Sequence, residues 1–118
     1  MDFTDALRVH AEWKLRFRRA LSGEERPDAA EVSDDSACEL GRWIHGRGGE
    51  RHGALEEFLA LRDRHREFHA EAAIVARLIE AGKLDQAEQA IGAVSRYATA
   101  SAALRTAVAA LRGLLQDQ

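Results

Sequence analysis

Cysteine, proline and long apolar runs are scarce in this sequence of 118 residues, which contains one cysteine and one proline. The longest apolar runs cover only a few residues, as in Ala72–Ala76, whereas a membrane-spanning helix needs roughly 20. The N-terminus carries Asp2 and Asp5 and lacks the basic and apolar regions of a secretory signal. A single cysteine allows no disulfide within the chain, which favours a reducing compartment. We therefore expect a soluble, cytoplasmic protein with no contact to membranes.

An excess of basic charge is also absent. The sequence has 17 Lys and Arg residues against 20 Asp and Glu residues, which gives a net charge of −3. Because the two signs are interspersed, no basic face is available for a phosphate backbone, and we expect no nucleic-acid partner. The length suits one domain, here taken as residues 1–118.

The alternating pattern of β-strands is missing too, and helix-forming residues dominate. Apolar residues recur at steps of three and four, and this periodicity predicts four helices: Phe3–Leu21, Ser33 or Asp34 to Ile44, Gly53–Ala81 and Asp85–Leu115. A helical turn is also conceivable at Asp28–Val32. Short connections between amphipathic helices favour an all-α fold, an up-down four-helix bundle with a short second helix.

Residues that begin and end helices support these boundaries. Ser33, followed by two aspartates, has the character of an N-cap with an acidic first turn. Asp85 and Glu88 resemble a capping box at the start of the fourth helix. Gly82 suits the end of the third helix, and the glycines at 46–49 are expected to end the second.

Three of the five histidines fall on helix faces that are predicted to be buried. His10 lies on the apolar face of the first helix, and His65 and His69 lie one turn apart on the third. Burying three imidazoles is costly unless each finds a partner, and one metal ion can bind all three. Cys38 would add a thiolate, which favours zinc over magnesium or calcium. Three imidazoles and one thiolate complete a tetrahedral zinc shell.

Each of these residues also has a structural interpretation. A single histidine on an apolar face is most often a hydrogen-bonded core residue, and a single cysteine is most often a small apolar filler. It is the combination that indicates a metal site. His45 is about 10 Å along a helix from Cys38 and His52 lies in the glycine-rich loop, so we expect neither to be a ligand.

The residues around these four positions form a compound motif. His10 is followed by Trp13, Cys38 by Leu40, Gly41 and Trp43, and His65 by Phe68 and His69. This order, H-x-x-W, C-x-L-G-x-W and H-x-x-F-H, resembles the chemoreceptor zinc-binding domain family over about residues 3–95. From the residues alone, Gly41 is expected on the same helix face as Cys38, where it permits close helix approach, and the two tryptophans pack at the core or its rim.

The resemblance implies a helical bundle that holds Zn²⁺ through His10, Cys38, His65 and His69. It also implies a homodimer and a role in bacterial signalling, beside a chemotaxis or cyclic-di-GMP signalling protein. Relatives usually carry such a signalling domain, and we expect this chain to be a stand-alone copy or a fragment.

Several functions remain open from the sequence. The first hypothesis is a sensor of zinc or of oxidants that acts through Cys38, because a metal-bound thiolate is the reactive form. The second is a structural zinc site or a zinc buffer. A zinc hydrolase is disfavoured because four protein ligands leave no open position, so we expect no enzyme. A metal-free interaction bundle is the last alternative.

Overall fold

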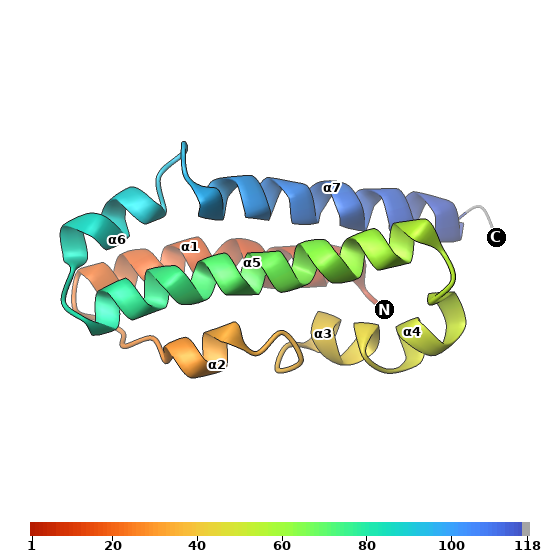
Figure 1. Cartoon of the computed structure of the whole chain (residues 1–118), viewed down its shortest axis with the longest axis horizontal. Helices are drawn as coiled ribbons and strands as arrows, with labels where there is room; N and C mark the ends of the chain where they lie inside the picture. Colours follow the sequence, from red (N-terminus) through yellow and green to blue (C-terminus); the bar gives the residue numbers. More distant parts are fainter. Residues whose placement is uncertain (117–118) are drawn as a thin grey trace.

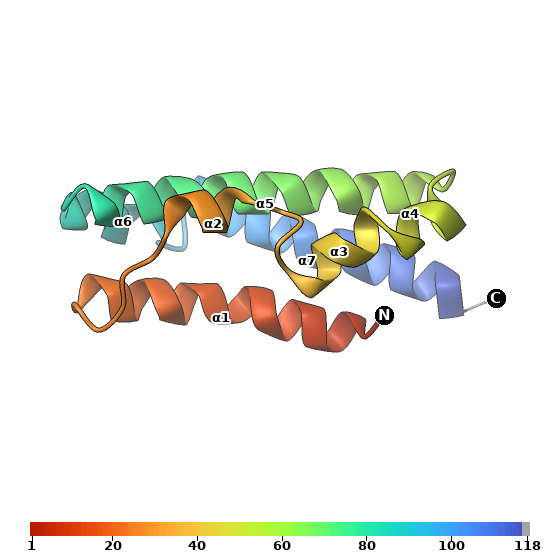
Figure 2. The same ribbon diagram turned by 90° about the horizontal axis from the view of Figure 1, so that it is seen from below.

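The computed structural model describes residues 1–116 and is all-α, as predicted. Four long segments run side by side along the molecule (Figures 1 and 2). The described helices are α1 (Phe3–Leu21), α2 (Ala29–Ser33), α3 (Glu39–Ile44), α4 (Arg47–His52), α5 (Glu56–Glu80), α6 (Leu84–Ala90) and α7 (Arg96–Gln116). Helix α5 lies at the centre of the packing, and α2 and α7 cover different sides of it. Within the described residues, no helix is both long enough and apolar enough to cross a membrane.

The first predicted helix is confirmed with its bounds, and the third is confirmed but begins three residues later and ends one residue earlier than predicted. Helix α1 begins where Asp2, as N-cap, accepts a hydrogen bond from the amide of Asp5. Helices α1 and α5 are each followed by a glycine with positive φ, Gly23 and Gly82, a conformation that glycine adopts without steric cost.

The second predicted helix, from Ser33 or Asp34 to Ile44, is helical only over Glu39–Ile44. The helical turn expected at Asp28–Val32 is confirmed as α2, whose last residue is Ser33, so Ser33 is not an N-cap. The N-cap is Asp28, whose carboxylate accepts hydrogen bonds from the amides of Ala30 and Glu31. Between the two helices, Asp34 Oδ1 accepts from the amide and hydroxyl of Ser36. Such local bonds compete with helical ones, which is why the chain turns there.

The other differences concern the glycine-rich segment and the fourth predicted helix. The glycines at 46–49 do end α3, but a further turn of helix, α4, follows at once. The fourth predicted helix is interrupted after Ile91, and α7 begins at Arg96. Asp85 is not a cap, because α6 begins after Lys83 without a side-chain cap hydrogen bond.

The core is formed by large apolar side chains from the long helices. Phe17 of α1, Leu61 and Phe68 of α5, and Leu104 and Leu111 of α7 are all essentially inaccessible to solvent. The two tryptophans are half-buried around this core, as predicted. These contacts fix α1 and α5 relative to each other, and thereby fix the histidines that the two helices carry.

Candidate metal centre

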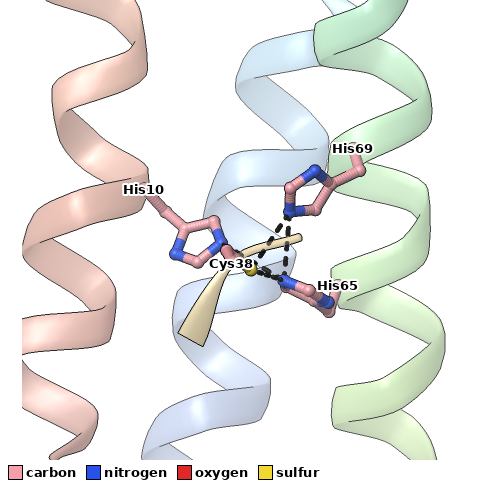
Figure 3. A group of neighbouring side chains, drawn as sticks. All are labelled: His10, Cys38, His65 and His69. Atoms are coloured by element: carbon pink, nitrogen blue, oxygen red, sulfur yellow. Dashed lines mark hydrogen bonds between the residues drawn. The ribbon is translucent and has the colours of Figure 1, made fainter. Parts of the chain in front are cut away.

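The four side chains predicted as ligands meet at one point inside the bundle (Figure 3). His10 comes from α1, His65 and His69 come from α5, and Cys38 precedes α3. Their ligand atoms all lie within 4.8 Å of one another, and the cluster contains no other residue of the described chain. The structure therefore brings together the four residues that were predicted as metal ligands, and no other candidate ligand of the described chain.

The histidines are held by the rigid part of the fold. His65 and His69 lie one turn apart on the buried face of α5, and His10 is 4% exposed. Phe68 packs edge-on against His10 and His69, with ring centroids 5.4 and 5.7 Å away. This packing restricts the rotamers of the imidazoles, so their positions do not depend on a bound ion alone.

Hydrogen bonds to backbone carbonyls fix two of the three imidazoles. His10 Nδ1 donates to the carbonyl of Ala6 at 2.6 Å, and His69 Nδ1 donates to that of Val32 at 2.8 Å. Because a carbonyl can only accept, both Nδ1 atoms carry the proton, and each neutral ring directs its Nε2 lone pair to the centre. Nδ1 of His65 is buried and has no partner within residues 1–116.

These carbonyls were not predicted from the sequence. The Ala6 carbonyl lies one turn before His10 and could have been anticipated from helix geometry. The Val32 carbonyl could not, because its position depends on how α2 packs on α5.

The distances between the ligand atoms fit one tetrahedral ion. His65 Nε2 lies 3.2 Å from His10 Nε2 and 3.1 Å from His69 Nε2. Cys38 Sγ lies 3.3 Å from His65 Nε2 and 3.7 Å from the Nε2 atoms of His10 and His69. Zinc bonds of about 2.0–2.1 Å to nitrogen and 2.3 Å to sulfur give tetrahedral edges of about 3.3 Å and 3.6 Å. The donor set therefore fits the group that the sequence implies.

Cys38 is held differently from the histidines. It is the N-cap of α3, with extended backbone angles (φ −92°, ψ 163°), and its Sγ accepts a hydrogen bond from the amide of Gly41 at 3.3 Å. The expectation that Cys38 lies within a helix is thus wrong. It is also the one member of the cluster that is not fully buried.

Gly41 has a role that differs from the predicted one. A Cβ atom there would lie 1.6 Å from the carbonyl oxygen of Asp35 and 3.1 Å from Cα of Ser36. Glycine therefore lets the segment just before Cys38 fold back onto α3, rather than letting two helices approach each other. This local fold brings Sγ of Cys38 to within 3.7 Å of the imidazole nitrogens of His65 and His69 on α5.

The electrostatics of the cluster favour neutral imidazoles. Burial lowers the pKa of all three histidines, and that of His65 falls to about 2. Burial also raises the pKa of the Cys38 thiol, while the hydrogen bond from Gly41 and the charge of Arg42 oppose that change. At neutral pH the imidazoles thus present free lone pairs, the form that a metal ion requires.

The remaining two histidines lie outside the cluster, as predicted. His45 is exposed, and its Nε2 lies 3.3 Å from Asp35 Oδ1. The ring of His52 packs against Trp43, with centroids 6.0 Å apart.

Comparison with protein families agrees with this geometry. The sequence profile of one family, described as the chemoreceptor zinc-binding domain, matches residues 10–76. The matched segment begins at His10 and includes Cys38, His65 and His69. No curated protein and no solved structure gave a significant match to the chain.

Proposed function

The chain belongs to the chemoreceptor zinc-binding domain family, and from this premise we propose that it is a cytoplasmic sensory domain of bacterial signalling that binds one zinc ion and has no enzymatic activity. The observation that carries the proposal is the convergence of three Nε2 atoms and one Sγ atom from three separate segments. His10, Cys38, His65 and His69 would hold the ion.

The donor set favours zinc over other divalent ions. A thiolate with three imidazoles suits zinc, whereas magnesium, calcium and manganese prefer oxygen ligands. Copper(II) binds nitrogen and sulfur too, but it prefers a tetragonal arrangement. Zinc, when bound, supplies a positive charge that keeps the Cys38 sulfur deprotonated.

The number of protein ligands supports a role other than catalysis. Catalytic zinc sites usually have three protein ligands and one position for water or substrate. Here four protein donors are already at the separations of a filled tetrahedron. A hydrolase would need Cys38 or a histidine to leave, and the three histidines are buried in the core.

Cys38 is the residue through which the site would respond to oxidants. Cys38 is the least buried of the four residues, and a metal-bound thiolate reacts as a nucleophile. With hydrogen peroxide, the sulfur donates an electron pair to one oxygen, the S–O bond forms and the O–O bond breaks. The products are the sulfenic acid of Cys38 and a hydroxide ion, which takes up a proton from solvent to become water. The oxidised sulfur is a poorer ligand, so oxidation would lower zinc affinity.

Metal analysis is the experiment that tests the proposal. Untagged protein, prepared under reducing conditions, is analysed for metal by mass spectrometry beside the Cys38→Ala and His52→Ala variants. We expect one zinc per chain in the native protein and in His52→Ala, and weaker retention in Cys38→Ala. Native protein that takes up no zinc after reconstitution would leave a metal-free interaction bundle.

The oxidant response is tested separately by kinetics. The rate at which peroxide modifies Cys38 is compared in zinc-loaded and EDTA-treated protein. Because burial raises the pKa of the free thiol, we expect the zinc-loaded form to react faster. Equal rates in both forms, no faster than a small free thiol, would leave zinc sensing or a structural role.

A structural zinc site or a zinc buffer is the second candidate, and one observation favours it. His10 and His65 join α1 to α5 through atoms in the core, so an ion there would tie the two helices together. A thermal unfolding midpoint that rises with zinc but is unaffected by oxidation of Cys38 would support this candidate. An unchanged midpoint on zinc binding would exclude it.

We further propose that the domain acts as a homodimer and transmits its state to a chemotaxis or cyclic-di-GMP signalling protein. The exposed face of α7 carries small residues, among them Ala102, Ala109 and Ala110, which would permit close approach of a second helix. Light scattering after size exclusion, with and without zinc, measures the mass. A monomer under both conditions would contradict the dimer.

A further inference from the structure

A cavity of about 280 Å³ opens between α1 and α7. Lys14 of α1 and Arg105 of α7 both line it, and no acidic residue does. Neither cation forms an ion pair with a carboxylate of residues 1–116. Two unneutralised cations therefore face the same hollow.

Tyr97 adds a polar group to the wall of this cavity. Its side chain is 4% exposed, and its ring packs on Phe17 and Phe68 with centroids 5.9 and 5.5 Å away. No hydrogen bond is found for its hydroxyl within residues 1–116, yet the hydroxyl is not among the polar atoms sealed from solvent. Tyr97 thus lines the cavity with a side chain whose hydroxyl has no hydrogen-bond partner in the described part of the chain.

The other lining residues define what the cavity can hold. Arg105 Nη1 donates to Ser101 Oγ at 3.0 Å, which restrains the guanidinium at the rim. Ile91 and Ala98 contribute apolar surface. Burial raises the pKa of Tyr97, so its hydroxyl remains a hydrogen-bond donor at neutral pH.

We propose that this cavity binds a small organic anion, a phosphate monoester or a carboxylate. Its charged group would lie between Lys14 and Arg105 and would accept a hydrogen bond from the Tyr97 hydroxyl. An ammonium and a guanidinium together recognise the oxygens of a phosphate or carboxylate, and the apolar wall at Ile91 favours an anion with an apolar body. This site uses no atom of the metal cluster, so it stands independently of the function proposed above.

The cavity has a direct packing connection to the metal centre. Tyr97 contacts Phe68, and Phe68 contacts His10 and His69. A ligand that moves the Tyr97 ring would therefore move a neighbour of two histidines of the cluster. A competing chelator titration, repeated with the anion present, measures any resulting change in metal affinity.

Binding is tested on the full, metal-loaded chain by two-dimensional NMR and calorimetry at constant ionic strength. The probes are phenyl phosphate, benzoate and inorganic phosphate, with benzylamine as the cationic control. We expect saturable binding of the anions, with the largest amide shifts at Lys14 and at 97–105. Phenyl phosphate binding better than benzoate would identify phosphate esters as the ligand class, and the reverse order would identify carboxylates.

Matched variants distinguish a site from diffuse attraction. Arg105→Gln should weaken phenyl phosphate binding about tenfold, the value of one charge-assisted contact, while Arg112→Gln, on the same helix but outside the cavity, should not. Lys14→Gln and Lys83→Gln form a second such pair. Tyr97→Phe keeps the ring and should weaken binding about threefold. Metal content and helicity confirm that each variant is folded.

Three outcomes would overturn the proposal. The first is no saturable binding of any anion up to about 10 mM, a concentration beyond which affinity is negligible. The second is equal loss in Arg105→Gln and Arg112→Gln. The third is a set of NMR shifts that is largest at Cys38 and His65, which would place the anion on the metal instead.

Discussion

Two parts of the molecule contribute to the metal centre in different ways. The histidines belong to α1 and α5, which have 19 and 25 residues and pack against the core. Cys38 belongs to the segment Asp28–His45, which contains two helices of five and six residues joined by a turn. The first part is rigid because long helices bury large apolar surfaces. The second part depends on caps, turns and one glycine contact.

This difference suggests a division of roles between the ligands. Three imidazoles form the preorganised part of the site, whereas the thiolate is brought to it by a turn between two short helices, whose core residues are Ala29, Val32, Leu40 and Ile44. Segments with few buried contacts open more readily than the rest of a protein. The donor that we expect to be released most readily is therefore also the one that oxidants would modify under the proposed function.

We expect the largest change in zinc affinity when a metal ligand is removed, and one ligand from each part can be compared. We expect His65→Ala to lower zinc affinity more than Cys38→Ala does, because α5 holds His65 in the buried core, whereas the short segment has to be ordered to bring Cys38 to the ion. The loss should exceed the roughly 10- to 100-fold typical of residues that only orient ligands. Competition with a chromogenic chelator measures both affinities, and His52→Ala is the control. A larger loss in Cys38→Ala would contradict the division of roles.

Gly41→Ala affects only the short segment. The added methyl group would clash with the Asp35 carbonyl, so the turn that carries Cys38 has to move, at a cost of about 1–3 kcal/mol. We expect weaker zinc binding while α1, α5 and α7 remain folded. Zinc titration and helicity check both points.

Gly113→Ala is the matched control for this variant. A methyl group added at residue 113 of α7 would meet no neighbouring side chain or segment within 4 Å, so alanine there should raise stability by up to about 1 kcal/mol. Equal zinc affinity in Gly41→Ala and Gly113→Ala would show that the turn before α3 does not position Cys38.

In the metal-free protein, a histidine of the rigid part makes the folding stability depend on pH. The pKa of His65 is lowered to about 2, below its value of about 6.5 in the unfolded chain. The unfolded state therefore binds the extra proton, and folding stability falls as pH decreases from about 6.5 towards 2. At pH 5 the loss from His65 should be about 2 kcal/mol.

Urea unfolding in EDTA at pH 7.5 and pH 5 measures this loss. His65→Gln, which cannot titrate, should lose less stability over the same interval than the native chain. An identical pH dependence in both proteins would mean that the histidine is already solvated and charged in the folded state.

The features that the sequence predicts correctly lie mainly in the long helices α1 and α5, and the features that it misses lie mainly in the short segment between them. The approximate boundaries of α1 and α5 and the placement of His10, His65 and His69 on buried helix faces follow from helical periodicity, which depends on local sequence. The all-α class follows from the same periodicity. For the segment between α1 and α5, the sequence predicts one helix because Ser33 and the two following aspartates form a plausible cap.

The structure of that segment depends on interactions that periodicity does not register. Asp34 bonds to Ser36 instead of to a helix start, and Gly41 contacts the carbonyl of Asp35. The interruption between α6 and α7 is not predicted either, because residues 91–95 contain no proline and only one glycine.

The cap of α2 gives the smallest and most specific test of the comparison. Asp28→Ala removes two hydrogen bonds to backbone amides and should reduce stability by about 1 kcal/mol. Because the Val32 carbonyl of α2 accepts from His69 Nδ1, the loss should extend to zinc affinity, by up to about tenfold. Asp2→Ala removes the cap of α1, two turns away from His10, and should cost similar stability with no change in affinity. If both variants lower zinc affinity equally, the short segment does not control the orientation of His69, and the two halves of the site are held with the same rigidity.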